Sequence, residues 1–233
     1  MDNFKTKLDK VFNEKPYTSI DVVGDGEQYI SDFSDPEKLN DYLLQISNQV
    51  LKLSFNNSIL DRQTFKIIST FKSLQEIYIS DTSITDEDFK HLAMLRNLKV
   101  LALDHADIDN EGLKHLMSIQ NLQGLYLGYS NIMDIGVKYF QLFKNLKILD
   151  LEATEITDRG LAYIQVLQSL QELYLGWVQI TDRGISYLKS FDNLKILNLF
   201  QTQITDKGKK RVRSLPNLRQ LENIDNIFER SWH

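Results

Sequence analysis

Apolar residues recur along this chain at seven positions of a 24-residue unit. In the copy from Leu146 to Ser169, these positions hold Leu146, Leu149, Leu151, Ile156, Leu161, Ile164 and Leu167. Alternation around the fourth and sixth positions is typical of a half-buried strand. A spacing of three at positions 16, 19 and 22 is typical of one helix face. Each unit therefore predicts a short strand, a turn and a helix of two to three turns. Neighbouring units must stack to bury these apolar faces.

Seven units follow one another without insertion. They begin at Val50, Leu74, Leu98, Leu122, Leu146, Leu170 and Leu194, and an incomplete eighth begins at Leu218. Such a fixed period predicts a solenoid. We therefore expect seven repeats over residues 50–217, followed by a partial eighth repeat and a C-terminal cap over residues 218–233. Residues 1–49 do not fit the repeat and predict an N-terminal hairpin-and-helix cap, with the hairpin around Gly24 to Gly26 and the helix starting after Asp35.

The turn of each unit carries its own pattern, shown by Thr157, Asp158 and Gly160. Thr and Asp are good acceptors for the unbonded amides of a helix start, so we expect both to cap the helix. A catalytic or metal-binding role for the Asp is disfavoured, because it recurs in every well-matched copy. The glycine, unfavourable inside a helix, indicates a close backbone approach. Small residues at position 9, such as Ser130 and Thr154, predict side chains inside the bend that bond to the backbone.

The combined pattern, LxxLxLxxTxITDxGLxxLxxLxN, resembles the leucine-rich repeat in its Ile-Thr-Asp-x-Gly-Leu subtype. The resemblance extends from Val50 to about Leu221. It implies an α/β fold, a right-handed leucine-rich-repeat solenoid shaped as a horseshoe, with a concave parallel β-sheet and convex helices. Position 9 departs from several other subtypes, which carry asparagine there. Members of this family share a scaffold rather than a chemistry, so the resemblance by itself implies no specific function.

Composition narrows the functional classes. The net charge of −5 disfavours nucleic acid as a partner, since nucleic-acid binders usually have a basic footprint. The absence of cysteine excludes disulfides and thiolate metal sites, and it favours a cytoplasmic protein. The charged start, which does not read as a secretory signal, also favours a cytoplasmic protein. No apolar run reaches the ~18 residues of a membrane span. The basic run from Lys207 to Arg213 is either a phosphate or partner patch or, as we favour, a solvated helix face. We expect no cofactor, and the sequence does not indicate an oligomeric state.

Two kinds of strand alternate along the solenoid, which gives a 48-residue super-period. The units from Leu74, Leu122 and Leu170 begin LQEIYIS, LQGLYLG and LQELYLG, whereas those from Leu98, Leu146 and Leu194 begin LKVLALD, LKILDLE and LKILNLF. Positions 5 and 7 face the concave side, with position 8 at its rim. We therefore expect aromatic walls, shallow slots at Gly128 and Gly176, and interleaved carboxylates. The alternative is a history of duplication combined with the β-propensity of Tyr. The candidate partner-binding residues are Tyr78, Asp81, Asp104, Tyr126, Tyr129, Asp150, Glu152, Tyr174, Trp177 and Phe200.

Rings beside carboxylates suit the Lys and Arg side chains of another protein. We therefore predict a non-catalytic protein–protein interaction module that binds a partner, such as a basic protein or segment, on its concave face. A stoichiometric inhibitor or immunity-type role is compatible with this hypothesis. A carbohydrate stacked on the rings is the alternative. Asp150 and Glu152 lie about 6.5 Å apart along a strand, near the separation of paired glycosidase carboxylates. Every acidic pair of this spacing shares that property, so we predict that the protein is not an enzyme.

Overall fold

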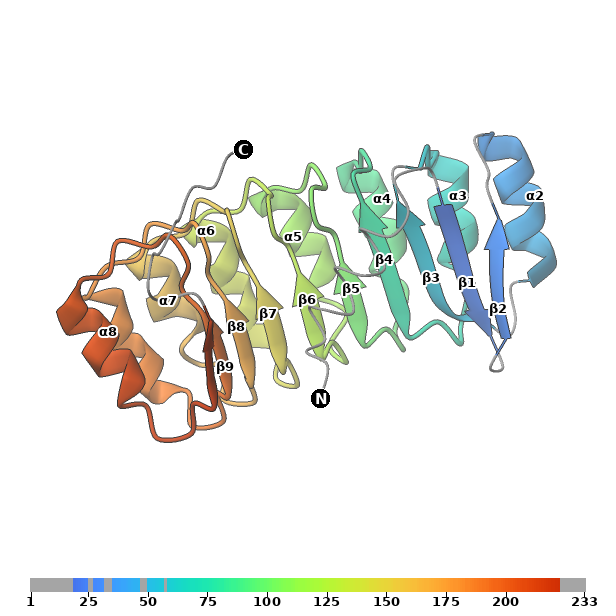
Figure 1. Cartoon of the computed structure of the whole chain (residues 1–233). Coiled ribbons are helices and arrows are strands. Elements are labelled where there is room, and N and C mark those ends of the chain that lie inside the picture. Colours follow the sequence, from blue (N-terminus) through green and yellow to red (C-terminus); the bar gives the residue numbers. More distant parts are fainter. Residues whose placement is uncertain (1–18, 25–26, 32–34, 47–49, 57, 223–233) are drawn as a thin grey trace, which may run out of the picture.

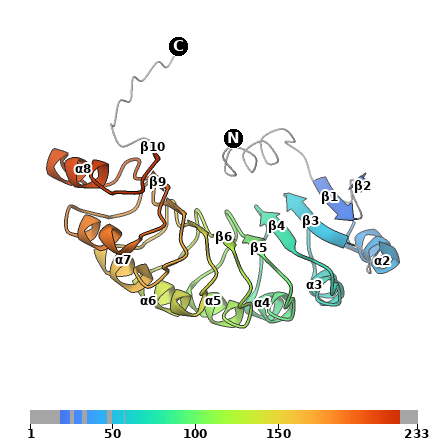
Figure 2. The same ribbon diagram turned by 90° about the horizontal axis from the view of Figure 1, so that it is seen from below.

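The computed structural model describes residues 19–24, 27–31, 35–46, 50–56 and 58–222. Within them, ten strands form one sheet in the order β10-β9-β8-β7-β6-β5-β4-β3-β1-β2. Figure 2 shows the strands on the inner side of an arc and the helices on its outer side. The right-handed horseshoe predicted from the repeats is confirmed.

Strands β3 to β10 are parallel and in register, so equal repeat positions stand side by side. They are β3 Val50–Asn56, β4 Glu76–Ser80, β5 Val100–Ala102, β6 Gly124–Tyr126, β7 Ile148–Asp150, β8 Glu172–Tyr174, β9 Ile196–Asn198 and β10 Gln220–Glu222. Leu149 and Leu151 illustrate the inward positions, which are fully buried. Their apolar side chains join one continuous core that runs from Leu39 to Val212.

The N-terminal end of the sheet is antiparallel. Strand β1 (Ser19–Gly24) pairs with β2 (Glu27–Ser31) on one side and with β3 on the other, and helix α2 (Pro36–Ile46) follows (Figure 1). Two antiparallel strands and a helix therefore lie in the region that the sequence assigns to the N-terminal cap. Residues 1–18 and 223–233 lie outside the described part of the chain, so the boundaries of the two caps remain predictions.

The helices of the repeats have about two turns. They are α3 Arg62–Ile68, α4 Asp86–Leu92, α5 Asn110–Leu116, α6 Asp134–Val137, α7 Asp158–Ile164 and α8 Asp206–Arg213, with 3-10 segments η1 Lys138–Leu142 and η2 Gly184–Ser190. Two repeats thus use 3-10 turns where an α-helix was expected. Both forms point the same apolar positions at the core, as Phe140 and Leu188 show.

The turn residues have two separate tasks. Thr157 caps α7 by accepting a hydrogen bond from the Arg159 amide at 3.3 Å, as predicted. The aspartate after it was predicted to cap as well, and this is wrong. Asp134 instead accepts bonds of 2.8 and 2.7 Å from the backbone nitrogen and hydroxyl of Thr157, one repeat further on. Asp158 bonds to Thr181 in the same way, so the aspartates join neighbouring repeats.

We call the series of bonds from Asp134, Asp158 and Asp182 to the threonine of the next repeat the aspartate ladder. Glycine at position 15 of the repeat leaves space for these aspartates. A Cβ added to Gly160 would lie 2.7 Å from the Asp134 Oδ1 atom. The close approach indicated by the glycine is therefore made by a side chain of the preceding repeat, not by backbone. The prediction for position 9 is confirmed. The hydroxyls of Ser130 and Thr154 donate to backbone carbonyls three residues earlier, at 2.6 and 2.7 Å.

Candidate partner-binding surface

The three tyrosines expected as exposed walls are buried. Tyr78, Tyr126 and Tyr174 are at most 2% exposed. Tyr78 and Tyr126 pack with Ala102, which stands between them in the sheet. Tyr78 also donates a hydrogen bond of 2.9 Å to Glu76, two residues earlier in its strand. The expectation of aromatic walls on the inner face is therefore wrong.

Alternation of large and small residues accounts for this burial. The residues beside the tyrosines on neighbouring strands are short, namely Ala102, Asp150 and Asn198. Strands lie only ~4.8 Å apart, so a ring that packs against the sheet needs a small neighbour. Burial, with the charge of Glu76 as a further cause, raises the pKa of Tyr78, so its hydroxyl stays protonated and can donate. The 48-residue super-period is thus in part a packing pattern.

The central carboxylates are also held inside the sheet. The Asp150 Oδ1 atom accepts a bond of 2.9 Å from the backbone nitrogen of Glu152. The Glu152 Oε1 atom accepts one of 2.6 Å from the Asn198 amide group, two strands away. Both acids are buried, at 4% and 6% exposure. Their position disfavours a catalytic role, because neither is open to a substrate.

The glycines at position 7 accommodate these acids. A Cβ on Gly176 would lie 3.0 Å from the Glu152 Oε1 atom, and one on Gly128 would lie 3.1 Å from the Asp104 Oδ1 atom. Asp104 also accepts a hydrogen bond of 3.2 Å from the Gly128 amide. Carboxylates therefore fill the space that was expected to form shallow slots beside the rings, and that expectation is wrong.

A row of rings, exposed except for the half-buried Phe200, lies instead beyond the carboxyl ends of strands β5, β6, β8 and β9. We call this row the aromatic ridge, and it consists of His105, Tyr129, Trp177 and Phe200. His105 stacks on Tyr129 with 4.2 Å between ring centroids and 11° between planes. Trp177 lies 6.3 Å from Tyr129 and meets Phe200 edge-on at 4.9 Å. Tyr129 and Trp177 are 47% and 48% exposed.

The backbone of the ridge is left-handed. His105, Tyr129 and Trp177 have φ angles of 56°, 58° and 57°. Asp81, Ala153 and Gln201 share this conformation in the other repeats. The amide of His105 donates to the Gly128 carbonyl at 3.0 Å, and that of Trp177 to Phe200 at 2.7 Å. Bulky residues rarely adopt positive φ. The stacking of repeats imposes this geometry and holds the rings in place.

The predicted site residues therefore divide into groups. Tyr129, Trp177 and Phe200 come together in the ridge. Asp81 is exposed and Asp104 is half-buried near one end of it. The remaining five are Tyr78, Tyr126, Asp150, Glu152 and Tyr174, and all are buried. His105 was missed, although it occupies the same repeat position as Tyr129 and Trp177, and that shared position was the available signal.

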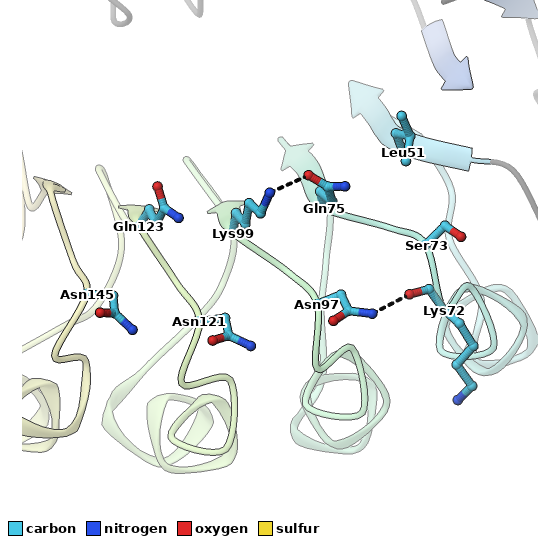
Figure 3. Close-up of a pocket in the computed structure, with 9 residues that line it drawn as sticks. All are labelled: Leu51, Lys72, Ser73, Gln75, Asn97, Lys99, Asn121, Gln123 and Asn145. Atoms are coloured by element: carbon cyan, nitrogen blue, oxygen red, sulfur yellow. Dashed lines mark hydrogen bonds between the residues drawn. The ribbon is translucent and has the colours of Figure 1, made fainter. Parts of the chain in front are cut away.

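A pocket of about 440 Å³ lies at the other ends of the strands, and its lining is polar. Figure 3 shows Lys99 reaching Gln75 and the Asn97 amide reaching the Lys72 carbonyl, at 2.7 and 2.8 Å. The same bonds recur in later repeats, for example from Lys147 to Gln123. The polar groups of this pocket thus serve to connect neighbouring repeats.

The described residues contain neither a cluster of metal-binding side chains nor a membrane-spanning helix. No group of three or more His, Asp or Glu side chains there is placed to hold a metal ion. None of the helices in the same ranges combines the length and the apolar character needed to cross a bilayer.

Comparison with protein families decides the assignment. The model of the leucine-rich repeat matches residues 95–117, 144–164, 166–189 and 193–209. The chain contains leucine-rich repeats. Comparison with curated proteins gives no match.

Solved structures agree with the fold of this chain. An internalin of Listeria monocytogenes aligns with 73% of the chain at a TM-score of 0.59 and 24% identity. The aligned region covers 46% of that internalin, so the chain spans less than half of its length. Internalin C2 of the same organism aligns with 78% of the chain and 82% of its own length, at a TM-score of 0.55 and 22% identity. At such identities, these similarities concern the fold alone.

Proposed function

We propose that this protein is a non-catalytic interaction module that binds another protein through the aromatic ridge. The observation that carries the proposal is the placement of Tyr129 and Trp177, two large exposed rings in a left-handed backbone. Solenoids commonly bind through the extended surface that their curvature creates. Tyr and Trp are also the residues most enriched among the energetic anchors of interfaces.

The backbone argues against an incidental origin of the ridge. A left-handed conformation is unfavourable by about 1–2 kcal/mol for most residues, and Gly, Asn and Asp adopt it most readily. Only Asp81 among the six left-handed positions is one of these types. Tyr129 and Trp177 are bulky instead, and the contact between their rings runs along the surface. Residues that break a local preference are expected at functional sites.

The proposed partner is recognised mainly by ring contacts. The sequence predicts that acids of the concave face pair with a basic segment. Two of these acids, Asp150 and Glu152, are instead hydrogen-bonded within the sheet. Asp81 and Asp104 remain near the ridge, where they could pair with a Lys or Arg at its end. An inhibitor or immunity-type role for this interaction stays a prediction.

The test replaces the three left-handed rings with a residue that suits their backbone. In the triple variant His105→Asn, Tyr129→Asn and Trp177→Asn, the fold should be as stable as the wild type or more so, because Asn tolerates positive φ. Partner binding should fall by roughly 100-fold or more, as expected for the loss of two interface anchors. The immobilised full chain is used to capture partners, and each is then purified and titrated by calorimetry.

Gln201→Asn is the matched control, since it changes the same repeat position next to the ridge. It should leave both stability and affinity unchanged within about twofold. A partner that binds the triple variant as tightly as the wild type would place the site elsewhere and refute the proposal.

Exposed rings also favour the carbohydrate alternative, because sugar faces can stack on them. A glycan array separates the two functions. Specific binding of a glycan that the triple variant loses, together with no protein partner, would replace the proposed function with sugar recognition.

A further inference from the structure

A second surface, on the convex side, carries a strong positive charge. Residues 159–219 contain ten lysines and arginines but only four acids, although the whole chain has a net charge of −5. This region includes α7, η2 and α8, which lie next to one another on the outer side of the arc (Figure 2). Arg159, Arg183 and Lys207 occupy the same repeat position in the three segments, and all three are exposed.

Three of the four acids of this region are engaged within the chain. Asp182 accepts bonds of 2.8 and 2.5 Å from the Thr205 amide and hydroxyl, Glu172 accepts one from the Tyr174 hydroxyl, and Asp206 forms a salt bridge with Lys209. The hydrogen bonds from Thr205 hold the pKa of Asp182 below its usual value, so its carboxylate remains an acceptor for the ladder. In the described part of the chain, no salt bridge joins an acid to Arg159, Arg183 or Lys207.

Helices α4 and α5 carry the opposite charge at the same repeat position. The position there holds Glu87 and Glu111, which form salt bridges to Lys90 and Lys114 one turn later. Such pairs of opposite charge stabilise a helix on its solvent-exposed face. The change from Glu to Arg and Lys in the later repeats leaves a row of cations instead.

This row is unfavourable for the helices that carry it. Arg159 and Lys207 are each the second residue of their helix, where the helix dipole disfavours positive charge. In α8, Lys207 stands three and four residues before Lys210 and Arg211, and like charges at this spacing repel. Besides the hydrogen bonds from Thr205, the charges of Arg211 and Lys207 lower the pKa of Asp182, and this attraction offsets part of the cost. The cations of the row that have no salt bridge within the described residues point to an anionic partner.

The geometry of the row indicates the shape of that partner. Packed helices lie about 10 Å apart. An extended peptide in the polyproline II conformation has three residues per turn and rises about 3.1 Å per residue, so every third side chain lies on one face and can reach the next cation. Carboxylates suit this row because arginine binds them with paired hydrogen bonds. We propose that the convex face of α7, η2 and α8 binds an extended acidic segment of a protein, with carboxylates at every third residue. This surface is separate from the ridge, so the inference goes beyond the proposed function.

The experiment uses the full chain and a fluorescein-labelled 12-residue peptide with Glu at every third position and Ser and Thr between. Binding is followed by fluorescence anisotropy at about 0.05 M salt, where charge pairs are weakly screened. The triple variant Arg159→Glu, Arg183→Glu and Lys207→Glu should bind roughly tenfold more weakly or worse. The control Lys66→Glu, Lys72→Glu and Lys144→Glu changes three exposed cations and the net charge equally. It should change affinity less than about twofold.

Three results would overturn the proposal. They are no binding by the wild type, equal weakening by both triple variants, and tighter binding of a DNA strand of equal charge than of the peptide. The second result would mean that only overall charge matters. Circular dichroism checks folding, and if the Glu variant unfolds, the corresponding Gln variant takes its place with the same expected loss.

Discussion

The residues that matter most for stacking are small or short side chains in the turns. Gly160 leaves space that the Asp134 carboxylate fills, and this carboxylate then bonds to Thr157. The same three-residue arrangement joins Asp158 to Thr181 near Gly184. The three junctions formed by Asp134, Asp158 and Asp182 therefore each depend on an aspartate and on a glycine one repeat later.

Gly160→Ala tests this dependence. The new Cβ would lie 2.7 Å from the Asp134 Oδ1 atom, so the carboxylate or the helix must shift. We expect a loss of about 1–3 kcal/mol in the free energy of unfolding, which is typical of overpacking, although Ala is the better helix former. In an Asp134→Ala background the same change should cost clearly less. Urea unfolding of the four proteins measures the coupling, and additive effects would show that the glycine has another purpose.

Only some residues of the aromatic ridge could be predicted from the sequence. Tyr129 and Trp177 could be selected from the sequence because they share a repeat position. Tyr126 was selected on similar grounds, yet its ring is buried. Strand alternation predicts the face of the sheet from which a side chain projects. Whether a ring there packs flat against the sheet and becomes buried depends on the size of the side chains on the neighbouring strands. The left-handed backbone at position 8 likewise arises from stacking and has no local sequence signal when Tyr or Trp stands there.

At the scale of elements, the aspartate ladder ties the start of one helical segment to the start of the next. Asp182, after β8, bonds to Thr205, which caps α8 through the Lys207 amide. The ladder therefore couples neighbouring elements through ionised side chains. Its strength should depend on pH.

Asp182→Asn measures this dependence. The pKa of Asp182 is lowered in the folded state by its bonds to Thr205, so its contribution is present above the unfolded pKa of about 4 and is lost as pH falls through the folded pKa. The difference in urea midpoint between pH 6 and pH 3 should be smaller for the variant than for the wild type. Asp192→Asn, in the same repeat but outside the ladder, is the control. A variant with the full pH dependence of the wild type would contradict this role.

Most elements could be placed from the sequence, because the apolar spacing repeats without insertion and each copy supports the others. The 3-10 form of η1 and η2 could not. Both segments keep their apolar positions buried, as Phe140 and Leu188 show. Apolar spacing is therefore compatible with either helix type over such a short length, and packing against neighbouring repeats selects between them.

Across the whole molecule, three side-chain rows alternate with the 48-residue period. Lysine faces glutamine at the second position, as in the bond from Lys99 to Gln75. Tyrosine faces a small residue at the fifth, as Tyr126 does with Ala102. Carboxylate faces glycine at the seventh, as Glu152 does with Gly176. A repeat is therefore matched to a neighbour of the other type, and the pair is the unit of stacking.

Removing repeats tests whether this matching carries energy. Deleting residues 122–145 brings two repeats of one type together, so that Lys99 faces Lys147 and Asp104 faces Glu152. Deleting residues 98–145 removes a pair and leaves Gln75 beside Lys147 and Tyr78 beside Asp150, as alternation requires. If stability depended only on the number of stacked repeats, the shorter protein would be the weaker. We expect the reverse, with the 48-residue deletion unfolding at a higher urea concentration, because the 24-residue deletion places like charges side by side. Midpoints that fall in simple order of length would show that the alternation contributes nothing to stacking.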